Sequence, residues 1–365
     1  MNIYTVTLIH KNYGSLLQAF ALQSCLRGFG ASPYIVLKEN GKKHSNAYYF
    51  LSRIYSDIRY ILKSDPDYPF FKRLMLRLDD FKFNIKYKKL DSFIKDKISI
   101  VRKKKKKELL NSISDDSIFL SGSDQVWSAV SKLPWFALKW VDEKYPKYSY
   151  AASMGKSSLD DEELKSYLES LSTFKAISLR EKQAVNIFKS TLGDKVRQDL
   201  DPSLLYDKFF WRRIQSPRLI DEPYVFVYRL RPNDDVFALA RKVAKEKQCK
   251  IVYTGLYAYR AKDILTVFDA GLEDFLSYID NSEAVITNSF HGTAFSIIYE
   301  KPFLSAKVAT TGSRAESLLT ILNLKSQFVE NVHEDYSLEI DYNSVNKTLC
   351  EERKKSLDYL KSVCG

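Results

Sequence analysis

The residue best suited to acid–base chemistry is His291, because imidazole titrates near neutral pH. It lies within the sequence TNSFHGTAFSI (287–297). The residues before it, 284–286, are apolar and partly β-branched, as in a buried parallel strand. Short polar residues at 287–289 are typical of a helix N-cap, and the apolar residues from Gly292 to about Tyr299 recur at helical spacing. The pattern therefore predicts a strand, a short turn that holds His291, and a helix that ends before Pro302.

Such a turn is a good place for a ligand. In open α/β sheets, ligands bind outside the carboxyl ends of the strands, where the first N–H groups of the next helix attract anions. We therefore expect an anion site around Ser289, Phe290 and Gly292, where the glycine would let a ligand approach the backbone. A lone histidine at a capped helix start can equally be an ordinary half-buried residue, so the local sequence leaves both interpretations open.

Other polar residues follow predicted strands in the same way. Asp124 and Gln125 stand on a glycine-containing loop after the strand 117–120, although an aspartate there can also simply cap a turn. Arg180 follows the strand 176–179. The turn 11–14 follows the first strand, 3–8, and lacks the GxGxxG fingerprint, so a tightly held dinucleotide is not indicated. We expect neither a cofactor nor a metal, because no cluster has metal-ligand spacing.

Predicted strands and helices alternate through the chain, which indicates an α/β fold with parallel sheets. We expect two Rossmann-like domains that face a cleft, at residues 1–205 and 221–343. The helix at 344–365 would cross back to the first domain. Residues 38–112 are basic and aromatic with mixed helical periodicity, so we interpret them as a helical insertion outside the sheet.

Composition narrows the class of protein. The chain has 365 residues and a net charge of +12. The segment 38–107 carries 21 Lys and Arg against 8 Asp and Glu, so it accounts for the whole excess. Such a patch suits anionic lipid or nucleic acid, but is more often a solvated surface. We expect no membrane-spanning helix, no signal peptide and four reduced cysteines, hence a cytoplasmic protein.

Six motifs occur in an order that resembles the polysaccharide pyruvyl transferase family. They span most of the chain, and together they are far more specific than any one alone; the basic segment 38–107 is the least typical part. The motifs are NYGSLLQAFALQ (12–23), SGSDQVW (121–127), SYAASMG (149–155), ISLREKQAV (177–185), DPSLL (201–205) and TNSFHGTAFSI (287–297).

The resemblance implies a GT-B-like fold and the transfer of pyruvate from phosphoenolpyruvate to two sugar hydroxyls, with release of phosphate. It makes His291 the acid/base and Arg180 a donor-binding residue. Family members often carry an arginine two residues before that histidine, where this chain has Ser289. Arg314 is our candidate for the missing cation, because phosphoenolpyruvate carries two anionic groups.

The remaining assignments complete the predicted site. Ser289, Phe290 and Gly292 would bind the donor with the two arginines. Asp124 would orient or deprotonate the acceptor hydroxyl, and Asn12, Tyr13, Gly14 and Gln125 would shape the acceptor site. The acceptor would be a sugar or a lipid-linked oligosaccharide, which places the protein peripherally on the inner face of the cytoplasmic membrane, with an anionic membrane surface as partner and no nucleic acid.

Two other functions remain open at this stage. A nucleotide-sugar-dependent glycosyltransferase can have the same GT-B fold, and fold alone does not separate the two enzymes. A non-enzymatic protein that binds nucleic acid or membrane through residues 38–107 would show salt-sensitive binding and release no phosphate.

Overall fold

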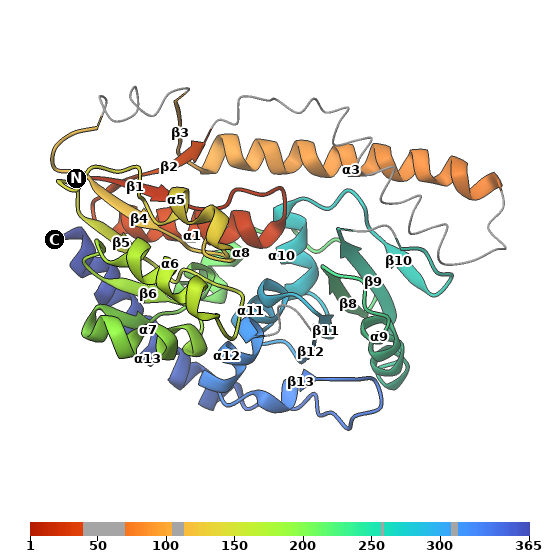
Figure 1. Ribbon diagram of the computed structural model, residues 1–365. Coiled ribbons are helices and arrows are strands. Elements are labelled where there is room, and N and C mark those ends of the chain that lie inside the picture. Colours follow the sequence, from red (N-terminus) through yellow and green to blue (C-terminus); the bar gives the residue numbers. More distant parts are fainter. Residues whose placement is uncertain (39–69, 104–112, 257–258, 308–312) are drawn as a thin grey trace.

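A computed structural model describes residues 1–38, 70–103, 113–256, 259–307 and 313–365 (Figure 1). The first half is built on a five-stranded parallel sheet of order β3-β2-β1-β4-β5. Its strands are β1 (Asn2–Val6), β2 (Ser32–Lys38), β3 (Ile100–Lys103), β4 (Ile118–Ser121) and β5 (Lys147–Ser149). Helix α1 (Tyr13–Gly28) joins β1 to β2 as the sequence pattern predicts, and the Asn12 side chain caps its first turn by accepting from Ser15 N–H.

The basic insertion contributes to this sheet, contrary to the prediction. Residues 100–103 form the edge strand β3, which pairs in parallel with β2. The long helix α3 (Phe70–Lys97) precedes it, and Figure 1 shows this helix running along the molecule from β3 towards β9 and β10. The strand was missed because its sequence, IVRK, has only two apolar residues, and an edge strand does not need more. Expectations for residues 39–69 and 104–112 lie outside the described residues.

A small parallel sheet of β6 (Ile177–Leu179) and β7 (Val196–Gln198) continues the first half beyond β5. Single parallel bridges from Tyr148 to Ala176 and from Ala152 to Leu179 connect it to the larger sheet. Its helices are α6 (Asp161–Leu171) and α7 (Lys182–Leu192), and the short α5 (Leu133–Phe136) lies in the connection before β5. The described residues of this half also include the 3₁₀ turns η1 (Val130–Lys132), η2 (Gly193–Lys195) and η3 (Pro202–Leu205).

The second half is a six-stranded parallel sheet of order β10-β9-β8-β11-β12-β13. Its strands are β8 (Tyr224–Arg229), β9 (Lys250–Gly255), β10 (Ile264–Thr266), β11 (Ala284–Thr287), β12 (Phe303–Ala306) and β13 (Phe328–Val329). Its helices are α8 (Lys208–Arg212), α9 (Asp235–Glu246), α10 (Leu272–Asp280), α11 (Phe290–Ile298) and α12 (Ser313–Ile321), with the 3₁₀ turn η4 (Lys325–Gln327) before β13. Strand order reverses between β8 and β11, as in a doubly wound fold.

One continuous apolar core joins the halves. Leu16 and Leu17 of α1 belong to the same buried cluster as Phe275 of α10 and Phe295 of α11. Helix α3 also reaches the second half, where Lys86 donates to the Gly255 carbonyl at 3.1 Å and is buried. The two Rossmann-like halves and the helices around them form the α/β, GT-B-like architecture that the sequence predicts.

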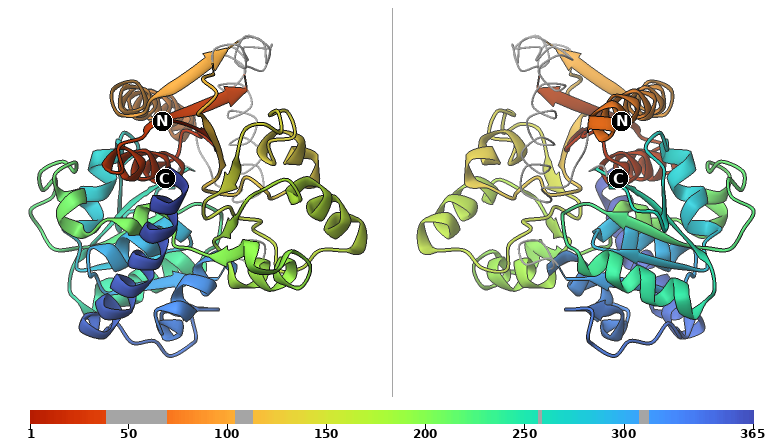
Figure 2. Two further views of the ribbon diagram at one scale, coloured as in Figure 1. Left: turned by 90° about the vertical axis from the view of Figure 1, so that its left-hand side faces the viewer. Right: turned by 90° about the vertical axis from the view of Figure 1, so that its right-hand side faces the viewer.

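The last helix, α13 (Tyr342–Cys364), touches both halves. Val345 and Leu349 near its start pack in the shared core. Near its end, Leu360 lies against residues of the first sheet, and the Tyr359 hydroxyl donates to the Ser149 carbonyl at 2.9 Å. Figure 2 shows this helix, in dark blue, ending near the N-terminus of the chain. Throughout the described ranges, no helix is both long and apolar enough to cross a membrane.

Candidate active site

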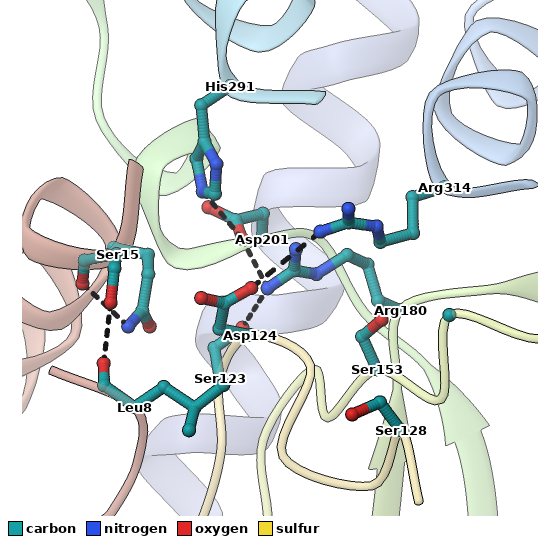
Figure 3. A network of polar contacts seen from close by, with 12 residues as sticks. Leu8, Ser15, Ser123, Asp124, Ser128, Ser153, Arg180, Asp201, His291 and Arg314 are labelled. Atoms are coloured by element: carbon teal, nitrogen blue, oxygen red, sulfur yellow. Dashed lines mark hydrogen bonds and ion pairs between the residues drawn. The ribbon is translucent and has the colours of Figure 1, made fainter. Parts of the chain in front are cut away.

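Five charged side chains from both halves converge where parallel strands end (Figure 3). Each follows a strand along the chain, so the carboxyl edges of the two sheets supply the site together. They are Asp124 after β4, Arg180 after β6, Asp201 after β7, His291 after β11 and Arg314 after β12. Among the described residues, no group of three histidine, cysteine or acidic residues is arranged so that it could hold a metal ion.

Asp201 is the fully buried centre of this cluster. Its Oδ1 accepts from the backbone N–H and the hydroxyl of Ser203, which fixes the carboxylate at the start of η3. The other oxygen, Oδ2, lies 2.7 Å from Nη2 of Arg180 and 3.7 Å from Nε2 of His291. Burial favours the neutral acid, but Arg180 and His291 outweigh it and hold the pKa of Asp201 below its ordinary value. Asp201 is therefore an ionised counter-ion to both residues.

Arg180 is held firmly while part of it stays free. Its Nη2 donates to Ser123 Oγ at 2.6 Å besides pairing with Asp201. Its Nε and Nη1 are buried and have no hydrogen-bond partner among the described residues. A buried N–H without a partner is costly, and these groups keep unused donor capacity.

His291 occupies a notch above Gly14 of the other half. A Cβ atom on Gly14 would lie 2.0 Å from Nδ1 of the imidazole and 2.4 Å from Cγ. On its other side, Nε2 faces Asp201 and makes no hydrogen bond within the described structure. Only a glycine at position 14 leaves room for the ring, so Gly14 positions the histidine and does not merely shape a turn.

Arg314 and Asp124 face each other across the site. The distance from Arg314 Nη1 to Asp124 Oδ1 is 3.7 Å, long for a hydrogen bond but close enough for electrostatic attraction. Arg314 is nearly buried, and its Nε has no partner in the described parts of the chain. Burial is the main reason that the pKa of Arg314 is lowered, with a smaller contribution from Arg180 and an opposing one from Asp124.

Phe290 connects the two arginines to the histidine. Its ring lies 4.7 Å from the Arg180 guanidinium carbon and 5.9 Å from that of Arg314, and it meets the His291 ring edge-on at 5.1 Å. The aromatic face attracts both cations and keeps their planes oriented. Phe290 thus contacts both arginines and the histidine through its ring, and its role in donor binding stays a prediction.

Ser289 and Gly292 have mainly local roles. The Ser289 hydroxyl accepts from Gly292 N–H at 3.3 Å and caps α11. We expected Gly292 to let a ligand approach, but the space beside its Cα is filled by Thr287, whose Oγ1 would lie 2.3 Å from an added Cβ. The glycine is therefore required by close packing of α11 on β11.

The predicted acceptor residues divide in the structure. Gln125 follows Asp124 and is half-buried against Gly155. A Cβ atom added to Gly155 would lie 2.2 Å from Nε2 of Gln125. The Asn12 side chain is used as the helix cap of α1. Tyr13 contradicts the prediction: it is buried, its hydroxyl donates to the Ala270 carbonyl at 2.8 Å, and its ring stacks on Phe275 in the shared core.

Sequence reasoning missed three site residues. Asp201 was visible only as part of the DPSLL motif, and Ser123 only as a neighbour of Asp124. Glu181 is buried beside Arg180, where one carboxylate oxygen accepts from Ser153 Oγ and Gly155 N–H and the other has no described partner. A buried acid after a strand is a usable signal, but the sequence alone does not say that Glu181 is buried.

Comparison with known families now places the chain. The family model described as polysaccharide pyruvyl transferase matches residues 12–306. The match covers most of the chain and every site residue except Arg314. The protein therefore belongs to the polysaccharide pyruvyl transferase family, which is a family of transferases that act on sugars.

Among similar solved structures, one reaches a TM-score of 0.50 and supports a shared fold. The chain is similar to HepE of Anabaena, in complex with UDP and glucose, at 9% identity and a TM-score of 0.50, with 100% of this chain and 94% of that one covered. A putative UDP-N-acetylglucosamine 2-epimerase from Listeria monocytogenes gives 11% identity and a TM-score of 0.49, with coverage of 99% and 90%. The UDP-N-acetylglucosamine 2-epimerase from Rickettsia bellii gives 12% and 0.44, with coverage of 98% and 97%. No curated protein sequence matches the chain.

Proposed function

We propose that the protein transfers the pyruvyl group of phosphoenolpyruvate to two hydroxyl groups of a sugar, forming a ketal and releasing phosphate. One observation carries the proposal: in a member of this family, Nε and Nη1 of Arg180 and Nε of Arg314 are buried without hydrogen-bond partners among the described residues, in the cluster that contains His291 (Figure 3). Phosphoenolpyruvate offers a phosphate and a carboxylate to such donors. Ser289 supplies no cation, so Arg314 takes that role from the next helix.

The reaction then needs one group that donates a proton to the donor substrate and one group that takes a proton from the acceptor hydroxyl. His291 protonates the methylene carbon of the enol, and the first sugar hydroxyl forms a bond to the adjacent carbon while Asp124 takes its proton. The bond to phosphate then breaks, the second hydroxyl attacks the same carbon, and its proton leaves with the phosphate. Exchange with solvent transfers the proton from Asp124 back to His291, which restores both residues. The Asp201 carboxylate places a negative charge 3.7 Å from Nε2 of His291.

The acceptor in this proposal is a sugar or a lipid-linked oligosaccharide, for which the protein would act at the inner face of the cytoplasmic membrane. Exposed lysines on the described part of α3, such as Lys82, Lys88 and Lys95, suit an anionic surface. The run at 103–107 adds five positive charges in sequence. Each basic residue near such a surface is worth about 1 kcal/mol, so several together can retain a protein there.

The test measures phosphate release from phosphoenolpyruvate with a panel of lipid-linked sugars. We expect His291→Gln to change the melting temperature little, since Nε2 makes no hydrogen bond that would be lost and Arg180 still pairs with Asp201, and to lower kcat by about 10²–10⁴. The matched control is His333→Gln, which changes an exposed histidine. A near-normal kcat in His291→Gln ends the catalytic assignment, and turnover of a nucleotide sugar instead of phosphoenolpyruvate favours the glycosyltransferase.

A further inference from the structure

Arg229, the last residue of β8, is a further buried arginine, outside the site described above. Its side chain is completely buried. None of its three guanidinium nitrogens has a hydrogen-bond partner among the residues that the structure describes. It is separate from the site above, because it is not among the contacts of Arg180, Asp201 or Arg314. A guanidinium has five N–H donors, so its full donor capacity is unused.

Three aromatic rings surround this guanidinium. Its central carbon lies 4.5 Å from the ring centre of Phe237, 5.3 Å from Tyr259 and 5.9 Å from Tyr253. The rings of Phe237 and Tyr259 also stack on each other at 3.8 Å. Aromatic faces attract a cation, but they accept few of its N–H groups, so stacking alone leaves the donors unsatisfied.

The guanidinium lies against a side chain from the first turn of a helix. Phe237 belongs to that turn of α9, which has 12 residues. The Asp234 side chain makes no capping hydrogen bond there, while Asn233 Oδ1 accepts from Asp235 N–H at 2.9 Å. A helix N-terminus and a buried arginine both favour a negative charge at the same place. Arg231 adds an exposed cation to the same turn, while Asp234 and Asp235 oppose it; the Asp234 side chain is exposed to solvent.

The position in the fold agrees with ligand binding. Arg229 is paired with Gly255 at the end of β9. Strand β11, the neighbour of β8 on its other side, leads through Asn288 to His291, and Asn288 Oδ1 accepts from Leu230 N–H just after Arg229. The turn after β8 thus lies at the carboxyl edge where strand order reverses, beside the turn that carries His291.

We infer that Arg229 and the first turn of α9 form a second oxyanion site that binds a phosphate group. Phosphate matches the planar guanidinium fork, and its charge is attracted by the helix start. The phosphate could belong to the donor or to the phosphate linkage of an activated sugar acceptor. The site itself does not rest on pyruvyl transfer, because binding is measured without turnover.

The test titrates the full-length protein with inorganic phosphate, phosphoenolpyruvate and uridine diphosphate by calorimetry, and follows the melting temperature with each probe. In Arg229→Met we expect affinity for inorganic phosphate to fall about 10-fold or more, because a charge-assisted bidentate contact is lost. The control Arg213→Met removes the same charge from an exposed side chain just after α8, outside the proposed site, and affinity should change less than about twofold. Arg229→Lys should bind with intermediate affinity.

Comparison of the three probes also identifies which substrate supplies the phosphate group. If Arg229 binds the donor, phosphoenolpyruvate loses affinity in Arg229→Met and uridine diphosphate does not; if it binds the acceptor, the order reverses. A purely structural arginine predicts a lower melting temperature with an unchanged rise on adding each probe. The inference is overturned if all three probes bind Arg229→Met and Arg229→Lys as they bind wild type, or if none binds the wild-type protein.

Discussion

The most discriminating prediction concerns Gly14, because it tests the placement of His291 without touching any ionisable group. In Gly14→Ala the new methyl group would lie 2.0 Å from Nδ1 and 2.7 Å from Cε1 of the imidazole. The ring must retreat by more than about 1 Å to reach a normal contact. Phe290 at 5.1 Å and Asp201 at 3.7 Å leave it little room to do so without losing its place in the site.

A displacement of about 1 Å costs on the order of 10²-fold in rate, or about 2.7 kcal/mol of transition-state stabilisation. Stability should change far less. Gly14 is the second residue of α1, so alanine gains up to about 1 kcal/mol of helix propensity, which offsets part of an overpacking cost of about 1–3 kcal/mol. We therefore expect a near-normal melting temperature together with a kcat about 100-fold lower.

The matched control is Gly28→Ala at the other end of the same helix, where an added Cβ meets nothing within 4 Å. It should keep wild-type kcat and KM in the phosphate-release assay. The double variant Gly14→Ala/His291→Gln should be no slower than His291→Gln alone, since both changes act through one side chain. Normal turnover by Gly14→Ala, or additive losses in the double variant, would refute the reasoning.

Four further predictions follow from the charged cluster and the basic segment. Arg180→Ala should raise the KM for phosphoenolpyruvate and also destabilise the protein by about 3–5 kcal/mol in denaturant unfolding, because it leaves Asp201 buried without its ion-pair partner. Arg314→Met should raise the same KM with a smaller loss of stability. An unchanged KM in Arg314→Met would exclude Arg314 as a donor-binding cation. Asp201→Asn should cost stability at neutral pH: the folded-state pKa lies below the unfolded value of about 3.9, so the carboxylate stabilises above about pH 4 and the difference from wild type shrinks as the pH falls further. Neutralising Lys103–Lys107 should reduce co-sedimentation with anionic vesicles at low salt, and unchanged binding would remove this segment from the membrane proposal.

Local sequence patterns predicted the strands, turns and helices that position the candidate site. The apolar run, the polar cap and the helical period around His291 each have a local cause, so strand β11, the turn and α11 appear where expected. Arg180 and Asp124 were found for the same reason, because each follows a recognisable strand. The strand β3 escaped because its residues are as basic as the insertion around it.

Contacts between distant residues could not be predicted in this way. Asp201 meets His291 across 90 positions of sequence, and nothing local to either residue indicates the pairing. Tyr13 shows the opposite limit: its turn lies at the correct strand end, yet the side chain points into the apolar core, since the direction of a ring depends on what packs against it. Gly14 beside it was named for the acceptor, and its close approach to His291 became visible only in three dimensions.

The division of the active site between two sheets has a consequence for recombination. His291 and Arg314 come from the second half, whereas Gly14, Asp124 and Arg180 come from the first. A chimera can join the first half of one family member to the second half of another. It must then keep the space beside Gly14 in the first half for the His291 ring of the second half. The helix α13 adds a second requirement, because it is encoded after the second half but packs on residues of the first. Substitutions at these meeting points should be inherited in matched sets, so exchange of sugar specificity between family members is best attempted by grafting loops within one half.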